Sequence, residues 1–188
     1  MDKCPQSCYN HSYLMKAKAC FMPFSLLPRM ITEELPDITP ELLAANGIRL
    51  LMLDFDNTIV PYTTDVPSQK MLDWLQMMQQ SEIQLCVVSN SKRDRVKIFC
   101  EKHDIPCITH AKKPFSKGIR QCLAKFDVPP ANAALVGDQI YTDTLGANCA
   151  GITSILVKAI HNHNFWLKLR HIAELPFIYA AKKRRITK

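Results

Sequence analysis

Five short apolar runs, separated by segments with helical periodicity, constrain the fold of this chain more than any other feature. The first run, IRLLMLD, is continuously apolar up to its final aspartate, which is typical of a strand covered on both faces. We expect strands over residues 48–54, 84–90, 105–110, 133–138 and 153–159. Strands that alternate with helices build βαβ units, so the sequence predicts an α/β fold, a doubly wound parallel sheet with helices on both faces.

Helical segments lie between these strands, and one precedes the first strand. Pro40 follows Thr39 at a helix start and Gly47 stands just past its end, which predicts a short helix at 40–46. A second helix is expected to open at Pro67 and to run to about residue 80. The remaining helices are expected at 92–103, 115–126 and 140–150.

The length of 188 residues suits one domain with appended segments. We expect an irregular N-terminal segment at 1–25, a single domain at 26–160 and a basic amphipathic tail at 161–188. Eight cysteines are scattered along the chain, several of them inside apolar runs. This distribution indicates free thiols in a reducing compartment rather than a disulfide framework or a zinc site.

Polar side chains gather where the predicted strands end. They are Asp54 and Asp56 after the first strand, Ser89 and Asn90 at the end of the second, and Asp138 at the end of the fourth. The carboxyl ends of parallel strands share one edge of the sheet, where ligands bind. Carboxylates that converge there must share a proton or bind a cation, and hard oxygen ligands favour Mg²⁺. Lys113, a few residues beyond the third strand, would neutralise phosphoryl oxygens at the same place.

Four motifs, in order, resemble those of the haloacid dehalogenase (HAD) phosphatase superfamily. DFDNT at 54–58 resembles D-x-D-x-T, and VVSN at 87–90 resembles the strand that ends in Ser or Thr. Lys113, which precedes a proline, resembles the third motif, and VGDQIYTD at 136–143 resembles G-D-x4-D. The match covers residues 48–157 and implies a HAD-like fold.

The resemblance is closer still to the YqeG-type class IIIA phosphatases of this superfamily. DFDNTIVP, SNS and GDQIYTD all match patterns of that group. Related enzymes of mitochondria and plastids dephosphorylate phosphatidylglycerophosphate. The resemblance therefore implies a Mg²⁺-dependent phosphomonoesterase that works through an aspartyl-phosphate.

The resemblance also implies catalytic and metal-binding roles for three aspartates. Asp54 would be the nucleophile that forms the aspartyl-phosphate. Asp56 would act as general acid for the leaving oxygen and as general base for the hydrolytic water. Asp54, Asp56 and Asp138 would hold the Mg²⁺, with Asp56 contributing its backbone carbonyl.

Five further residues receive binding or supporting roles from the same resemblance. Ser89, Asn90 and Lys113 would hold the oxygens of the transferring phosphoryl group. Thr58 and Asp143 would support the site, Thr58 by bonding Asp54 or the loop backbone and Asp143 by contacting the metal ligands or by reaching the metal through a water. Lys112 competes with its neighbour for the lysine role, and the following proline favours Lys113.

The spacing of the motifs bears on the substrate. HAD enzymes gain selectivity for small substrates from an inserted cap domain, and neither 56–89 nor 90–113 is long enough to hold one. An open site favours a large phosphate that is presented by a lipid, a protein or a polynucleotide end. Nucleic acid is disfavoured, because the chain has no RNA-reading motif and a body without net charge. A protein or nucleic-acid-end phosphatase, a phosphotransferase and a non-catalytic HAD-like binding module stay as alternatives.

The C-terminal tail suggests a way to reach a lipid. Residues 158–188 carry eight basic residues against one acidic residue, which accounts for the whole net charge of +7. Trp166 and Tyr179 add aromatic side chains of the kind that favour a membrane interface. We expect residues 160–188 to lie on an anionic phospholipid surface, or else to pack on the domain. No apolar stretch is long enough to cross a bilayer, so we expect a cytoplasmic protein that can associate with the inner membrane face.

Overall fold

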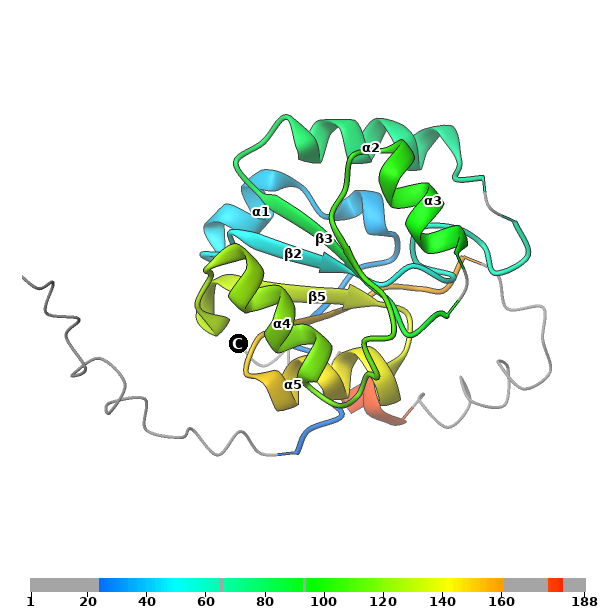
Figure 1. The fold of residues 1–188 in the computed structure, drawn as a ribbon. Helices are drawn as coiled ribbons and strands as arrows, with labels where there is room; N and C mark the ends of the chain where they lie inside the picture. Colours follow the sequence, from blue (N-terminus) through cyan, green and yellow to red (C-terminus); the bar gives the residue numbers. More distant parts are fainter. Residues whose placement is uncertain (1–23, 65, 93, 161–175, 181–188) are drawn as a thin grey trace, which may run out of the picture.

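A six-stranded parallel sheet forms the centre of the molecule, and its strand order is β1-β6-β5-β2-β3-β4 (Figure 1). The computed structural model describes residues 24–64, 66–92, 94–160 and 176–180. The strands are β1 (Met30–Ile31), β2 (Leu50–Leu53), β3 (Gln84–Val88), β4 (Cys107–Ile108), β5 (Ala133–Gly137) and β6 (Thr153–Leu156). Five of them are the predicted strands. The sequence analysis did not predict β1, a two-residue edge strand in the segment before the first helix.

Helices cover both faces of the sheet, as the α/β prediction required. They are α1 (Pro40–Ala45), α2 (Gln69–Gln79), α3 (Arg95–Lys102), α4 (Lys117–Phe126) and α5 (Leu145–Ala150). Short turns are added by η2 (Leu35–Asp37), η3 (Pro130–Asn132) and the π-helical η4 (Ile140–Thr144). The helices α1, α2 and α3 lie on one side of the sheet, and α4 and α5 lie on the other (Figure 1). The doubly wound fold is therefore confirmed.

Capping side chains decide where the first two helices begin. The Thr39 hydroxyl accepts a hydrogen bond from the backbone of Leu42, so α1 starts at Pro40 as predicted. The Ser68 hydroxyl accepts one from the backbone of Met71. For this reason α2 begins at Gln69, two residues later than the prediction that placed its start at Pro67.

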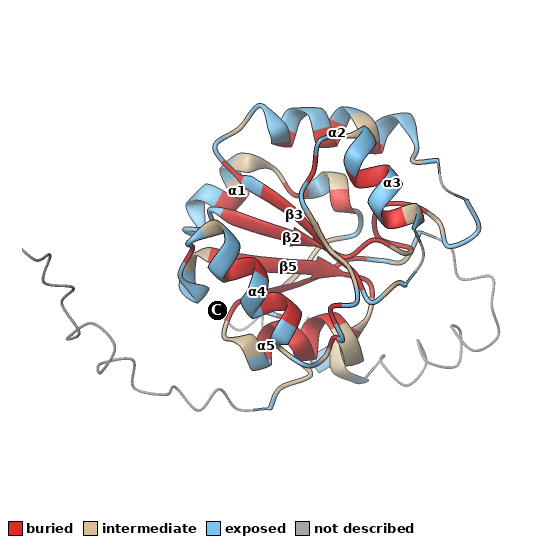
Figure 2. Cartoon of the chain, in the orientation of Figure 1, coloured by how far each residue is buried: buried red, intermediate tan, exposed pale blue. Residues whose placement is uncertain are grey.

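The side chains of β2 divide between two hydrophobic layers. Leu51 and Leu53 pack into the layer beneath α1, α2 and α3, whereas Leu50 and Met52 pack into the layer beneath α4 and α5. All four are fully buried. Figure 2 shows the same division, with buried residues along the strands and on the inward sides of the helices. Burial on both faces explains why the sequence of this strand is continuously apolar.

The connections of the sheet diverge between β2 and β5. The chain connects β2 through α2 to the adjacent β3, and it connects β5 through α5 to the adjacent β6. These two connections run in opposite directions along the strand order of the sheet. Such a divergence leaves a crevice at the carboxyl ends of the two strands, where ligands bind in α/β sheets. The predicted site residues Asp54 and Asp138 directly follow these two strands.

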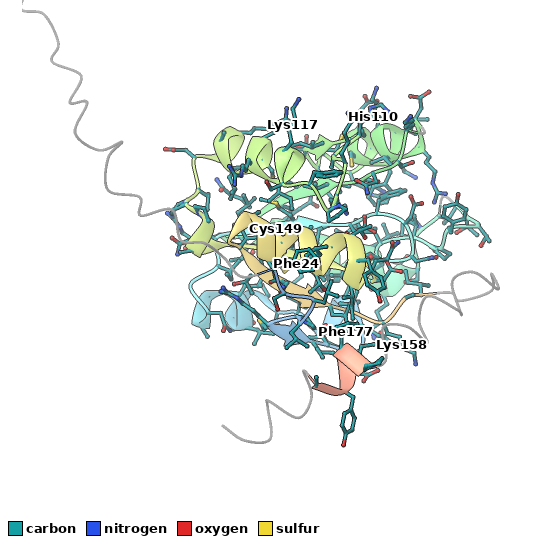
Figure 3. All side chains as sticks on the ribbon, turned by 90° about the horizontal axis from the view of Figure 1, so that it is seen from below. Phe24, His110, Lys117, Cys149, Lys158 and Phe177 are labelled. Atoms are coloured by element: carbon teal, nitrogen blue, oxygen red, sulfur yellow. The ribbon has the colours of Figure 1, made fainter. Side chains whose placement is uncertain are left out.

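Little of the C-terminal tail belongs to the described part of the chain. A helical turn at 176–180 carries Phe177, whose ring meets Tyr141 edge-on at a centroid distance of 6.4 Å (Figure 3). Tyr179 on the same turn is exposed. Trp166 and the basic residues of the predicted amphipathic tail lie outside the described residues, as do residues 1–23.

Two further observations concern the described residues alone. No helix among them combines the length and apolar character required to span a bilayer. Their five cysteines are free thiols, as predicted, and three of them are buried.

Candidate active site

Three buried carboxylates meet at the carboxyl edge of the sheet. Asp54 directly follows β2, Asp138 directly follows β5, and Asp143 lies on η4. Each of the three has a carboxylate oxygen that lies within 4.8 Å of those of the other two. The sequence analysis expected Asp54 and Asp138 to converge, and they do. It gave Asp143 only a supporting role, whereas the structure places its side chain inside the cluster.

Asp143 reaches the cluster because η4 folds back over Gly137. The backbone N–H of Gln139 donates to Asp143 Oδ2 at 3.2 Å, and the N–H of Asp143 donates to the carbonyl of Gln139 at 2.9 Å. A Cβ atom at position 137 would collide with the Asp143 carboxyl group. Glycine in the G-D-x4-D motif is therefore required by this close approach.

Lys113 is the cation inside this group of acids. Its Nζ lies 2.6 Å from Asp54 Oδ1 and 2.7 Å from Asp143 Oδ1. Burial alone would lower the pKa of Lys113, but the carboxylates of Asp143 and Asp54 raise it above the ordinary lysine value. The neighbouring Lys112 is exposed. The structure therefore brings Lys113, rather than Lys112, to the predicted position.

Burial and electrostatic repulsion also act on Asp143. Burial raises its pKa to about 6, and the nearby charge of Asp54 acts in the same direction, whereas Lys113 opposes both. Asp143 thus holds a proton more strongly than an ordinary carboxyl group. This is the expected behaviour of an acid crowded by other acids in a site that lacks enough positive charge.

Ser89 and Asn90 directly follow β3, and Asn90 bonds the backbone of Lys113 on both sides. The Asn90 side chain accepts from the Lys113 N–H at 2.6 Å and donates to the Lys113 carbonyl at 2.8 Å. Ser89 is buried, and its hydroxyl accepts from the backbone of Ser91 at 3.0 Å. Asn90 therefore fixes the position of Lys113. The predicted contacts of Ser89 and Asn90 with phosphate stay predictions.

The loop after β2 is held by Asn57 and Thr58. The Thr58 hydroxyl donates to Asp54 Oδ2 at 3.4 Å, which is the supporting contact that the sequence predicted. Asn57 has a positive φ of 61°, a conformation that asparagine tolerates better than most residues. Its Oδ1 accepts from the Tyr62 N–H at 3.0 Å, and its carbonyl accepts from the Ile160 N–H at 2.9 Å. Asn57 thus connects two positions within the loop and also connects the loop to the segment after β6.

Asp56 is oriented differently from the other acids. Its carboxylate is not one of the three that converge, and Asp56 Oδ1 lies 3.5 Å from the guanidinium of Arg95 at the start of α3. Arg95 is not among the site residues that the sequence predicts. An arginine in the first turn of a helix carries no local signal that separates a site residue from an ordinary surface charge.

The side chains of the cluster suit a divalent cation. Three carboxylates face one lysine in a buried place, so the group carries an excess of negative charge when all its acids are ionised. Buried charges of one sign are costly unless a counter-charge offsets them. Carboxylate oxygens are hard ligands of the type that binds small divalent cations. A cleft of about 490 Å³ is lined in part by Thr58, Lys70 and Lys158, and none of the three acids lines it.

Comparisons with known proteins agree with this geometry. A family model described as HAD-hydrolase-like matches residues 110–163. The chain is 29% identical to the Bacillus subtilis protein named "Probable phosphatase YqeG" over 159 residues. This aligned region covers 84% of this chain and 92% of that protein.

Two solved structures share the fold. An uncharacterized protein from Listeria monocytogenes serotype 4b aligns with a TM-score of 0.51 at 18% identity, over 63% of this chain and 84% of the other. A protein from Streptomyces avermitilis, assigned to the HAD hydrolases, aligns with a TM-score of 0.50 at 16% identity, over 66% and 77%. The four motifs gathered at one edge of the sheet, the family model and the Bacillus relative together support a HAD-type phosphatase.

Proposed function

We propose that the protein is a Mg²⁺-dependent phosphomonoesterase that forms a covalent aspartyl-phosphate on Asp54. One observation carries the proposal. The Asp54 carboxylate is buried beside Asp138 and Asp143 while Lys113 and Thr58 contact its two oxygens. A carboxylate fixed in this way is oriented for attack, and Lys113 is placed to neutralise oxygens of the phosphoryl group.

The reaction takes two displacements at phosphorus. In the first, an oxygen of Asp54 forms a bond to phosphorus while the ester oxygen departs, and Asp56 gives that oxygen its proton. In the second, water attacks the phosphorus of the aspartyl-phosphate, Asp56 takes the proton from the water, and the bond to Asp54 breaks. The products are an alcohol and inorganic phosphate, and both aspartates return to their starting state.

Mg²⁺ held by Asp54, Asp138 and Asp143, together with the backbone carbonyl of Asp56, would offset the repulsion between the anionic nucleophile and the anionic phosphate. Lys113 contributes a fixed positive charge on the side of Asp54 and Asp143. Asn90 keeps Lys113 in place through its backbone. Ser89, at the end of β3, is the further donor that we assign to the phosphoryl oxygens.

The substrate that we propose is a phosphate presented by a large surface, with phosphatidylglycerophosphate as the first candidate. The absence of a cap supports this choice, since only α2 stands between β2 and β3 and only α3 between β3 and β4 in the described chain. Exposed apolar side chains occur on segments that follow three strands of the sheet. They are Tyr62 and Val66 after β2, Phe115 after β4 and Ile160 after β6. Exposed Lys112 and Lys158 add positive charge on the same segments, which suits an anionic lipid surface.

A panel of phosphomonoesters tests the activity and the substrate separately. The purified protein is assayed with Mg²⁺ on phosphatidylglycerophosphate in mixed micelles and on 4-nitrophenyl phosphate, and Asp54→Asn serves as the inactive control. We expect kcat/KM to be at least tenfold higher for the lipid, and Asp54→Asn to abolish both activities. Lipid turnover no faster than aryl phosphate turnover would reject the lipid assignment and leave the phosphatase in place.

Peripheral membrane association through residues 160–188 is part of the same proposal. The full chain and a version that ends at Ile160 are sedimented with vesicles that contain anionic phospholipid, and with neutral vesicles as control. We expect the full chain to bind anionic vesicles more strongly than the shortened one. Equal binding of the two would show that the tail does not supply the membrane contact.

A further inference from the structure

Arg95 links α3 to the loop that follows the first motif. Its guanidinium donates to three backbone carbonyls of that loop, those of Pro61 at 3.2 Å, Tyr62 at 3.0 Å and Thr64 at 2.7 Å. A planar group with five donors can hold several acceptors at fixed angles, which a lysine cannot do. Arg95 therefore fastens this loop to the start of α3.

The same guanidinium contacts the first motif itself. It lies 3.5 Å from Asp56 Oδ1 and stacks over the ring of Phe55 at 5.2 Å from the centroid. Phe55 in turn packs edge-on against Phe99, at a ring distance of 5.3 Å, and both rings are buried. Arg95 is thus held by a rigid apolar support on one side while it faces the Asp56 carboxylate on the other.

These contacts give Arg95 a defined position relative to the reacting groups. Asp56 is the acid and base of the proposed mechanism, but its carboxylate stands apart from the cluster of Asp54, Asp138 and Asp143. Arg95, the first residue of α3, lies 3.5 Å from this carboxylate and thus contacts it from a separate element. Arg95 is therefore placed to orient the Asp56 carboxylate.

We propose that Arg95 is a positioning residue that orients Asp56 for proton transfer to the leaving oxygen. This inference rests on the proposed phosphatase function and adds to it a residue outside the four motifs. Arg95 acts through Asp56 and through the loop at 61–64, and not by contact with the phosphoryl group, since its two terminal nitrogens donate to the carbonyls of Pro61, Tyr62 and Thr64.

The leaving group distinguishes this role from a structural one. An alkoxide is a poor leaving group and needs a proton as it departs, whereas 4-nitrophenolate departs readily without one. Loss of a well-placed general acid therefore slows alkyl phosphates far more than 4-nitrophenyl phosphate. Loss of folded protein, or of phosphate binding, slows both substrates by the same factor.

The experiment measures kcat/KM for hexyl phosphate and for 4-nitrophenyl phosphate with Mg²⁺. The variants are Arg95→Met, Arg95→Lys and Asp56→Asn, with Arg120→Met as the control because Arg120 is an exposed arginine on α4. We expect Arg95→Met to lose on the order of 10²-fold more activity on hexyl phosphate than on 4-nitrophenyl phosphate, in the same direction as Asp56→Asn. Arg120→Met should match the wild type on both substrates.

Arg95→Lys guards against a folding defect in the methionine variant. Lysine keeps the positive charge near Asp56 but cannot hold three carbonyls, so we expect a selective loss of the same kind and of smaller size. Equal losses on the two substrates in both Arg95 variants, or no loss, would overturn the inference while the phosphatase function stands. A wild-type protein that hydrolyses neither ester would instead overturn the proposed function and this inference with it.

Discussion

Replacing Lys113 by methionine should destabilise the protein far more than replacing any exposed lysine. The Lys113 ammonium contacts Asp54 at 2.6 Å and Asp143 at 2.7 Å. At an effective dielectric constant of about 20, each contact is worth roughly 6 kcal/mol of attraction before desolvation. Desolvation of the three charges offsets much of this sum, and loss of one partner from a buried ion pair typically costs about 3–5 kcal/mol. Lys113→Met should therefore lower the free energy of unfolding by about that amount.

Thermal and urea unfolding in EDTA measure this loss. For a chain of 188 residues, about 2–4 °C is expected per kcal/mol, so the melting temperature should fall by roughly 6–20 °C. Excess Mg²⁺ should recover part of the difference, because a divalent cation supplies the charge that the lysine no longer provides. Lys112→Met is the matched control, since Lys112 is adjacent and exposed. A Lys113→Met variant as stable as Lys112→Met would refute the account of the cluster given above.

Three further predictions concern the acids and a glycine of the site. Asp138→Asn should abolish the rise in melting temperature that Mg²⁺ produces. Asp73 is an exposed acid on α2, so the control variant Asp73→Asn should keep this rise. A Mg²⁺-dependent rise that persists in Asp138→Asn would contradict the proposed ligand set. The pKa of Asp143 is raised from 3.8 to about 6 in the folded protein, so the folded state binds this proton more tightly than the unfolded chain. Stability in EDTA should consequently fall as the pH rises from about 4 to about 6, by on the order of 2 kcal/mol; urea unfolding across this range should show the fall in the wild type and a smaller one in Asp143→Asn. Gly137→Ala should displace the Asp143 carboxyl and lower kcat/KM at least tenfold on 4-nitrophenyl phosphate, with a loss of about 1–3 kcal/mol of stability. Gly47→Ala, which strains a positive φ away from the site, should cost about 1 kcal/mol and leave kcat/KM unchanged.

The order of strands and helices could be predicted because the inner strands β2, β3, β5 and β6 are apolar runs that are largely buried. Leu50 to Leu53 read as a buried strand without any knowledge of their neighbours, and Asp54 ends the apolar run of this strand. The edge strand β1 escaped prediction for the opposite reason. Met30 and Ile31 are only half-buried, and two residues are too few to show a period.

The site could be predicted only in part, because motifs specify residues and not the directions of side chains. The convergence of Asp54 and Asp138 follows from adjacent strands that end at the same level. The inclusion of Asp143 depends on η4, a π-helical turn that folds over Gly137, and periodicity does not distinguish such a turn from an α-helix. The contact of Arg95 with Asp56 joins residues 39 positions apart, on separate elements, and only the tertiary structure brings them together.

The pairing of β2 with β5 has a consequence for the nascent chain. Asp54 leaves the ribosome 84 residues ahead of Asp138, and the two strands that carry them become neighbours only after β3 and β4 have been made. Until then, no cluster of like charges exists to oppose collapse of the apolar layers. Repulsion among the acids of the active site therefore arises only after most residues of the hydrophobic core have been synthesised.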